Sequence, residues 1–260
     1  MKGTPMNTNS EIKDAVKEKY SQIAKGELTV EKAISSCCGS GECGGSAVVA
    51  MALKYEDAER ASIPDGADLG LGCGTPTAFA DLMEGMTVLD LGSGAGIDCF
   101  IASKHVGTTG KVIGVDMTEA MIAKANENKE KVSMENVEFR LGEIESLPID
   151  SNAVDRVISN CVINLVPDKE SAFIEIYRVL KPGGKFAISD IVIDGTISDG
   201  ERRDASLWAG CISGAIDRKE YLGIIKQVGF RDVHVTSEKK YDYKLSTGAG
   251  LFSITVSGTK

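Results

Sequence analysis

The chain has 260 residues, of which 42% are hydrophobic, and its net charge at neutral pH is -9. This composition predicts a globular protein, and the lack of a basic run argues against nucleic acid as a partner. Residues 1–25 are polar and charged, and no segment is apolar over the roughly 20 residues that a bilayer requires, so we expect a cytoplasmic protein without a membrane partner.

The N-terminal part predicts a helix and then a loop rich in thiols. Ser10 can cap a helix that ends at Gly26, with an apolar stripe made of Ile12, Val16, Tyr20 and Ile23. Residues 35–46 are too rich in glycine and serine for a regular element, and a short helix is possible over 47–53. The loop carries three cysteines, Cys37, Cys38 and Cys43.

A second glycine-rich stretch, residues 69–74, places Cys73 on an irregular loop. Thr75 and Pro76 suit the start of a helix that we expect to run to about Glu84.

From residue 87 the pattern alternates between strands and helices, as a parallel sheet with crossover helices requires. Strands are expected over 87–91, 111–116, 137–141, 154–159 and 185–190, and helices over 97–105, 119–131 and 169–180. The C-terminal part predicts a helix that begins with an Asp-x-x-Glu cap at Asp217 and ends at Gly229. Strands over 232–236 and 251–257 are expected to complete the sheet as an antiparallel pair at one edge.

The turn after the first of these strands, residues 92–96, has glycine at every second position. Such a turn at the end of a first parallel strand is typical of nucleotide-like ligand sites, and Asp116 at the end of the next strand suits ribose recognition. The dinucleotide fingerprint requires a third glycine where Ile97 stands, which disfavours a pyrophosphate ligand.

Segments 88–96 and 180–184 (Leu-Lys-Pro-Gly-Gly), together with Asp116, resemble the class I S-adenosylmethionine (SAM) methyltransferases. The resemblance implies a Rossmann-like α/β fold with a seven-stranded, mostly parallel sheet and an antiparallel edge. It also implies SAM as co-substrate, without a permanent metal.

The same resemblance places Gly92 and Gly94 against the methionine part of SAM, Asp116 on the ribose hydroxyls and residues 142–144 near the adenine. An acid such as Asp90 suits the positive charge of the sulfonium. A solvated surface acid is an equal alternative for Glu143. The expected cofactor-binding residues are Asp90, Gly92, Gly94, Asp116, Met117, Gly142, Glu143 and Asn160.

Three cysteines from separate segments, Cys73, Cys161 and Cys211, are each expected at or near the cofactor end of the sheet. Three converging thiolates suit a soft, thiophilic centre. The alternative is that each is a small buried residue, which is the usual fate of cysteine. The segment after the fourth strand, residues 159–164, contains neither of two motifs typical of nucleobase methylation. These are Asn/Asp-Pro-Pro-aromatic, for exocyclic amino groups, and Pro-Cys, for 5-methylcytosine in RNA.

Segments 69–76, 159–165 and 208–215, which contain these three cysteines, resemble the arsenite methyltransferases. The resemblance implies that trivalent arsenic, supplied as arsenite or a thiol adduct, binds to Cys73, Cys161 and Cys211 and attacks the SAM methyl through its lone pair. It further implies that Cys38 or Cys43 forms a disulfide with Cys73 during turnover. A cellular thiol reductant such as thioredoxin or glutathione is the implied partner.

The predicted organisation is an N-terminal helix and cysteine-rich loop (1–66), a SAM-binding core (67–195) and an arsenic-binding C-terminal segment with the closing strands (196–260). A zinc site made of Cys37, Cys38, Cys43 and Cys73 is disfavoured, because no Cys-x-x-Cys pair is present. A disordered tail with incidental thiols is another interpretation of residues 35–46. The competing functions are a small-molecule C- or O-methyltransferase of the quinone and sterol type and a non-catalytic thiol-based arsenic or metal sensor.

Overall fold

The computed structural model describes residues 8–28, 63–204, 207–208 and 210–260. The expected loop cysteines Cys37, Cys38 and Cys43 and the possible helix over 47–53 lie outside the described residues.

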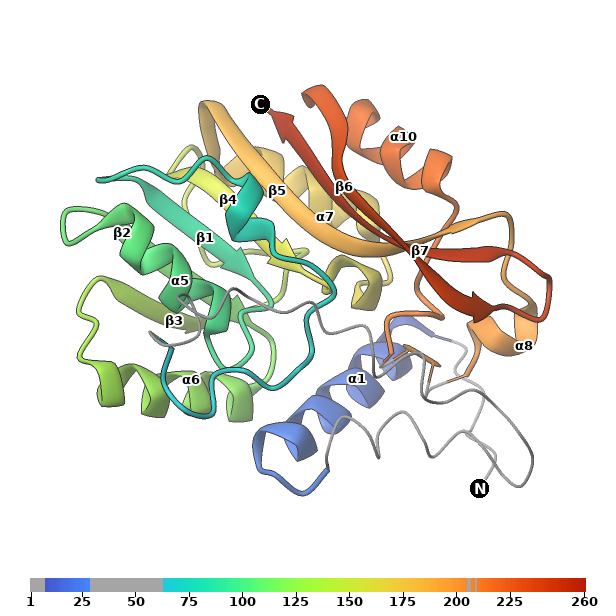
Figure 1. Cartoon of the computed structure of the whole chain (residues 1–260), viewed down its shortest axis with the longest axis horizontal. Coiled ribbons are helices and arrows are strands. Elements are labelled where there is room, and N and C mark those ends of the chain that lie inside the picture. The colour runs from blue at the N-terminus through green and yellow to red at the C-terminus, as the bar shows by residue number, and fades with distance from the viewer. Residues whose placement is uncertain (1–7, 29–62, 205–206, 209) are drawn as a thin grey trace.

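One mixed sheet organises the described chain, with its strands in the order β3-β2-β1-β4-β5-β7-β6 (Figure 1). Only β7 is antiparallel to its two neighbours, β5 and β6. This topology confirms the predicted α/β class with an antiparallel edge. The strands are β1 (Thr87–Leu91), β2 (Lys111–Asp116), β3 (Val137–Leu141), β4 (Val154–Asn160), β5 (Leu180–Asp194), β6 (Arg231–Lys244) and β7 (Gly250–Thr259).

The helices alternate with the parallel strands, as predicted. They are α1 (Asn9–Ala24), α5 (Ile97–Val106), α6 (Glu119–Val132), α7 (Lys169–Val179), α8 (Asp199–Arg202) and α10 (Arg218–Val228), with short 3-10 turns η1 (Pro76–Phe79) and η2 (Ile163–Leu165). Over the described residues, none of the helices has the length and apolar character needed to cross a bilayer.

Three local predictions were wrong. Thr8 rather than Ser10 caps α1, because Thr8 and Glu11 form a reciprocal capping box. The helix expected to reach Glu84 stops after η1, and Asp81 adopts a positive φ of 47° that a right-handed helix cannot accommodate. The fifth strand begins at Leu180, directly after α7, rather than at residue 185.

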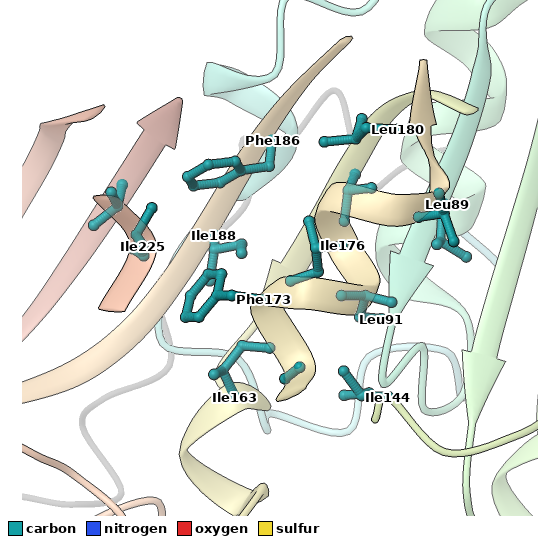
Figure 2. Close-up of a cluster of buried hydrophobic side chains, with 14 of the residues drawn as sticks. Leu89, Leu91, Ile144, Ile163, Phe173, Ile176, Leu180, Phe186, Ile188 and Ile225 are labelled. Atoms are coloured by element: carbon teal, nitrogen blue, oxygen red, sulfur yellow. The ribbon is translucent and has the colours of Figure 1, made fainter. Parts of the chain in front are cut away.

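Alternate residues of the central strands bury opposite faces of the sheet. Leu89 and Leu91 of β1 belong to the largest hydrophobic cluster, together with Phe173 of α7 (Figure 2). Val88 faces the other way and packs in the cluster that contains Phe100 of α5. The strands are therefore held between α7 and α10 on one face and α5 on the other.

Phe173 is fully buried and lies edge-on to Tyr221 at 5.6 Å between ring centroids. We expect Phe173→Ala to lower the free energy of unfolding by about 3–5 kcal/mol, because the ring's contacts are lost and a cavity remains. Chemical denaturation measures this change. The adjacent Ile174 is 50% exposed, so Ile174→Ala should cost less than about 1 kcal/mol. Equal losses for the two variants would contradict this assignment of the core.

Candidate active site

A cavity opens at the carboxyl ends of the central parallel strands. It lies where β1 is flanked by β2 on one side and β4 on the other, which is where open α/β sheets bind ligands. All of the residues predicted to bind the cofactor line this one cavity: Asp90, Gly92, Gly94, Asp116, Met117, Gly142, Glu143 and Asn160.

The glycine turn after β1 is tied to the end of β2. The Asp116 carboxylate accepts hydrogen bonds from the backbone N–H of Gly94 at 3.0 Å and of Thr118 at 2.8 Å. Burial raises the pKa of Asp116, and these two hydrogen bonds oppose that rise. Gly92 has a φ of 63°, and a Cβ added there would collide with Val162. Asp116 therefore fixes the turn and keeps its carboxylate at the cavity wall.

Asp90 gives the floor of the cavity a buried acid. Burial, followed by the nearby charge of Asp98, raises the pKa of Asp90 well above its usual range. Its carboxylate accepts a hydrogen bond from the Cys99 thiol at 3.2 Å, which accounts for one cysteine that the predicted chemistry does not use. A cationic ligand in the cavity would favour ionisation of Asp90.

Helix α1 lies beyond the end of the sheet toward which β1 points (Figure 1). Lys13, Val16 and Tyr20 of α1 line the cavity. The Lys13 ammonium forms ion pairs with Glu143 at 2.6 Å and Glu145 at 2.9 Å. The sequence predicts the apolar stripe of α1, but it contains no signal that the stripe would face a ligand cavity.

The three predicted thiols are brought together. Cys73, Cys161 and Cys211 are buried, free and members of one hydrophobic cluster, which also contains Val16 of α1. The Cys161 thiol is in hydrogen-bonding contact with the thiols of both Cys211 and Cys73. Those two contacts and burial raise the pKa of Cys161 well above its usual value, and burial raises the pKa of Cys73.

The loop that carries Cys73 is held by side chains from β4 and β7. The Asn160 carboxamide oxygen accepts hydrogen bonds from the N–H groups of Cys73 and Gly74, both at 3.0 Å, and its amide donates to the Gly74 carbonyl at 2.8 Å. The Ser253 hydroxyl donates to the Cys73 carbonyl at 2.8 Å. A Cβ on Gly74 would collide with Ser189, so this close approach requires glycine. Asn160 thus lines the cofactor cavity and also positions Cys73.

The other two cysteines have left-handed backbone conformations, with φ of 62° at Cys161 and 60° at Cys211. Such a conformation costs about 1–3 kcal/mol for a residue other than glycine and is concentrated at functional sites. It is held at Cys161 by the N–H bond to the Ser189 carbonyl at 2.7 Å, and the Cys211 thiol donates to the Cys161 carbonyl at 3.0 Å. The folded chain therefore maintains a strained backbone where the thiols meet.

Among the described residues, no three His, Cys, Asp or Glu side chains are arranged as a ready-made metal site. Cys161 contacts each of the other two thiols. Rotation about χ1 between staggered rotamers can turn thiols toward a common point.

Sequence reasoning missed several polar groups around the thiols. Tyr20 of α1 hydrogen-bonds to Cys211 through its hydroxyl, whose pKa burial raises well above the usual value. Asp190 of β5 is fully buried, accepts a hydrogen bond from the Tyr221 hydroxyl at 3.1 Å, and has a pKa that burial raises to about 7. These residues come from elements far apart in the sequence, so spacing carried no signal of their convergence.

Comparison with known proteins agrees with this geometry. A family model described as a methyltransferase domain matches residues 82–229. The arsenite methyltransferase of Halobacterium salinarum is 43% identical over 96% of this chain and 67% of its own length. That of Aquipseudomonas alcaligenes is 40% identical over 65% of this chain and 50% of its own length. The chain therefore spans between half and about two thirds of these relatives.

An arsenic(III) S-adenosylmethionine methyltransferase from Chlamydomonas reinhardtii has a similar solved structure. Its TM-score is 0.67 at 33% identity, with 82% of this chain and 73% of that chain covered. The fold and the cavity at the ends of β1 and β2 thus define a methyltransferase of the class I type. Within that class, this chain belongs to the arsenite methyltransferase family.

Removal of the Asn160 carboxamide tests how the Cys73 loop is held. In Asn160→Ala, two N–H groups lose their acceptor, so the loop should open more often and Cys73 should be alkylated about tenfold faster. Mass spectrometry of the Cys73 peptide measures this rate. Asn126→Ala on the exposed face of α6 is the matched control and should leave the rate unchanged. An unchanged Cys73 rate in Asn160→Ala would contradict the positioning role.

Proposed function

We propose that this protein transfers methyl groups from S-adenosylmethionine to trivalent arsenic held by Cys73, Cys161 and Cys211. The observation that carries the proposal is the meeting of three buried thiols beside the cavity of the glycine turn, with Cys161 lining that cavity. The similarity to arsenite methyltransferases supports the same acceptor.

The cavity suits SAM in its charge. Six acids line it against one lysine, Lys13, so its balance favours a cation; the acids are Asp68, Asp90, Asp98, Asp116, Glu143 and Glu145. The glycine turn allows the backbone to approach a ligand closely, and Asp116 lies at the end of β2, where an acid can accept hydrogen bonds from ribose hydroxyls. When bound, SAM supplies an electrophilic methyl group on a positively charged sulfur.

Arsenic is loaded by thiol exchange. Each cysteine forms an As–S bond as the bond from arsenic to one of its original ligands breaks. The cysteine proton leaves with that departing ligand. Arsenic stays trivalent and keeps its lone pair. Three sulfur ligands match the preference of a soft centre, and the lining of the cofactor cavity by Cys161 supports a position of arsenic beside the cofactor.

In the transfer step, the protein acts by positioning arsenic relative to the methyl group of SAM. The Asn160 and Ser253 hydrogen bonds fix the Cys73 loop, and α1 lines the cavity, so the arsenic lone pair can be held in line with the methyl group. Such positioning can supply roughly 7–11 kcal/mol at best. An As–C bond forms, the C–S bond breaks and its electron pair stays on sulfur. No general base is required because the lone pair is already free.

Methyl transfer formally oxidises arsenic by two electrons, so a reductant must restore the trivalent state. We propose that the thiolate of Cys38 or Cys43 attacks the arsenic-bound sulfur of Cys73: an S–S bond forms, the As–S bond breaks, and its electron pair returns arsenic to the trivalent state. Thioredoxin or glutathione then reduces that disulfide. A reducing compartment, which we take to be the cytoplasm, would keep the free thiols reduced.

Replacement of each arsenic-binding cysteine tests the acceptor site. Cys73→Ser, Cys161→Ser and Cys211→Ser should each lower methylation of trivalent arsenic at least about 100-fold, because a hydroxyl is a poor ligand for a soft centre. SAM binding, measured by calorimetry, should persist in all three. Cys99→Ser is the matched control: its hydroxyl can keep the bond to Asp90 and methylation should continue.

Speciation of the arsenic products after incubation with arsenite, SAM and a thiol separates the competing functions. Full activity in any of the three serine variants would show that the replaced cysteine is not a required arsenic ligand. A wild-type protein that binds arsenite and SAM yet releases no S-adenosylhomocysteine would instead be a sensor.

The redox step has a separate test. Of Cys38→Ser and Cys43→Ser, one should stop after a single methyl transfer, because its disulfide with Cys73 cannot form, while the other continues to turn over. Single-turnover and multiple-turnover assays with thioredoxin as reductant measure this difference. Normal cycling in both variants would contradict a disulfide between Cys73 and one of these two residues.

A further inference from the structure

A second cavity lies beside the cofactor cavity. It borders the start of α1 at Thr8, Asn9 and Ile12. The cofactor cavity borders α1 further along, at Lys13, Val16 and Tyr20. Pro167 lines both cavities. The volume of the second cavity, about 630 Å³, is within the range of small-molecule sites. The two cavities are therefore neighbours separated by α1 and the segment around Pro167.

Charged groups of both signs line this second cavity. Lys169, Arg202 and Arg203 contribute cations, and Asp199 and Glu220 are among the acids. Both arginines and both acids are exposed, so they form its rim.

Lys169 differs from the other cations because it is 7% exposed. Among the described residues its ammonium donates to the Val166 carbonyl at 3.1 Å. Burial lowers the pKa of Lys169 to about 8, and the charges of Asp190 and Glu220 oppose that fall. An ammonium has three donors, so Lys169 retains the capacity to bind a carboxylate in the cavity.

The second cavity lies next to the segment that carries Cys211. Trp208 forms part of its wall, and the Cys211 N–H donates to the Trp208 carbonyl at 2.9 Å. Lys169 is close enough to Cys211 for their charges to interact. The wall of the second cavity is therefore hydrogen-bonded to the backbone of one of the three thiol residues, so the cavity and the thiol site are neighbours.

We propose that the second cavity binds the carrier that delivers arsenic, a zwitterionic peptide thiol whose carboxylate contacts Lys169 and the arginines and whose ammonium contacts the rim acids. This inference rests on the proposed function. In each exchange an As–S bond to the carrier breaks and one to a cysteine of the protein forms. The cysteine proton passes to the departing carrier thiolate, and arsenic keeps its oxidation state.

The test compares arsenic supplied as its glutathione adduct with arsenic supplied as its 2-mercaptoethanol adduct, which has no charged groups. Lys169→Met should raise KM for the glutathione adduct roughly tenfold or more and change KM for the neutral adduct less than about twofold. Arg203→Ala, at an exposed position, should shift KM in the same direction. Lys104→Met removes an equal charge from the exposed side of α5 and should alter neither value.

A second readout measures inhibition by a ligand that cannot carry arsenic. S-methylglutathione carries the same charges without a free thiol, and it should compete with the glutathione adduct in the wild type and compete less well in Arg203→Ala. Equal KM changes for both adducts, or no competition by S-methylglutathione, would overturn the carrier site. Failure of the wild type to methylate even the neutral adduct would instead contradict the proposed function.

Discussion

The hydrogen bonds of one side chain, Asn160, connect the two halves of this site. Its carboxamide lies at the end of β4, lines the cofactor cavity and binds the backbone of Cys73 and Gly74 through three hydrogen bonds. The loop from the N-terminal side of the core is thereby fixed against the end of the sheet, within reach of Cys161. Without this link, the fold would still form a cavity beside the glycine turn, but the third thiol would not be held beside it.

The surrounding structure stabilises what is locally unfavourable. Two of the three cysteines have left-handed backbones, and three thiols, a buried aspartate and a tyrosine lie where a simpler core would be apolar. The large hydrophobic clusters on both faces of the sheet stabilise the fold and so offset the free-energy cost of these groups. The carboxyl ends of β4 and β5 can therefore carry polar and strained residues. Helix α1 contributes side chains to the cofactor cavity, to the cluster that contains the thiols and to the second cavity, so these three parts share one helix.

Much of the fold was predictable because its signals are local. The glycine turn, Asp116 and the alternation of strands and helices predict the parallel core, and the expected cofactor-binding residues line one cavity. Cys73, Cys161 and Cys211 were predicted from the resemblance of their segments to the arsenite methyltransferases. What the sequence could not predict depends on contacts between distant segments: the place of α1 beside the cavity, the bond from Tyr20 to Cys211, and the burial of Asp190 and Lys169. The end of η1 at Phe79 was missed because the positive φ of a single residue, Asp81, overrides a favourable helix start.

The central claim is that Cys73, Cys161 and Cys211 together bind trivalent arsenic. The most direct measurement is X-ray absorption at the arsenic edge on a variant in which Cys37, Cys38 and Cys43 are serine, after removal of excess thiol. We predict three sulfur neighbours around arsenic and no oxygen, with one sulfur lost in each additional serine variant at the three site cysteines. An arsenic centre with two or fewer sulfur neighbours, or one unaffected by loss of Cys161, would contradict this assignment.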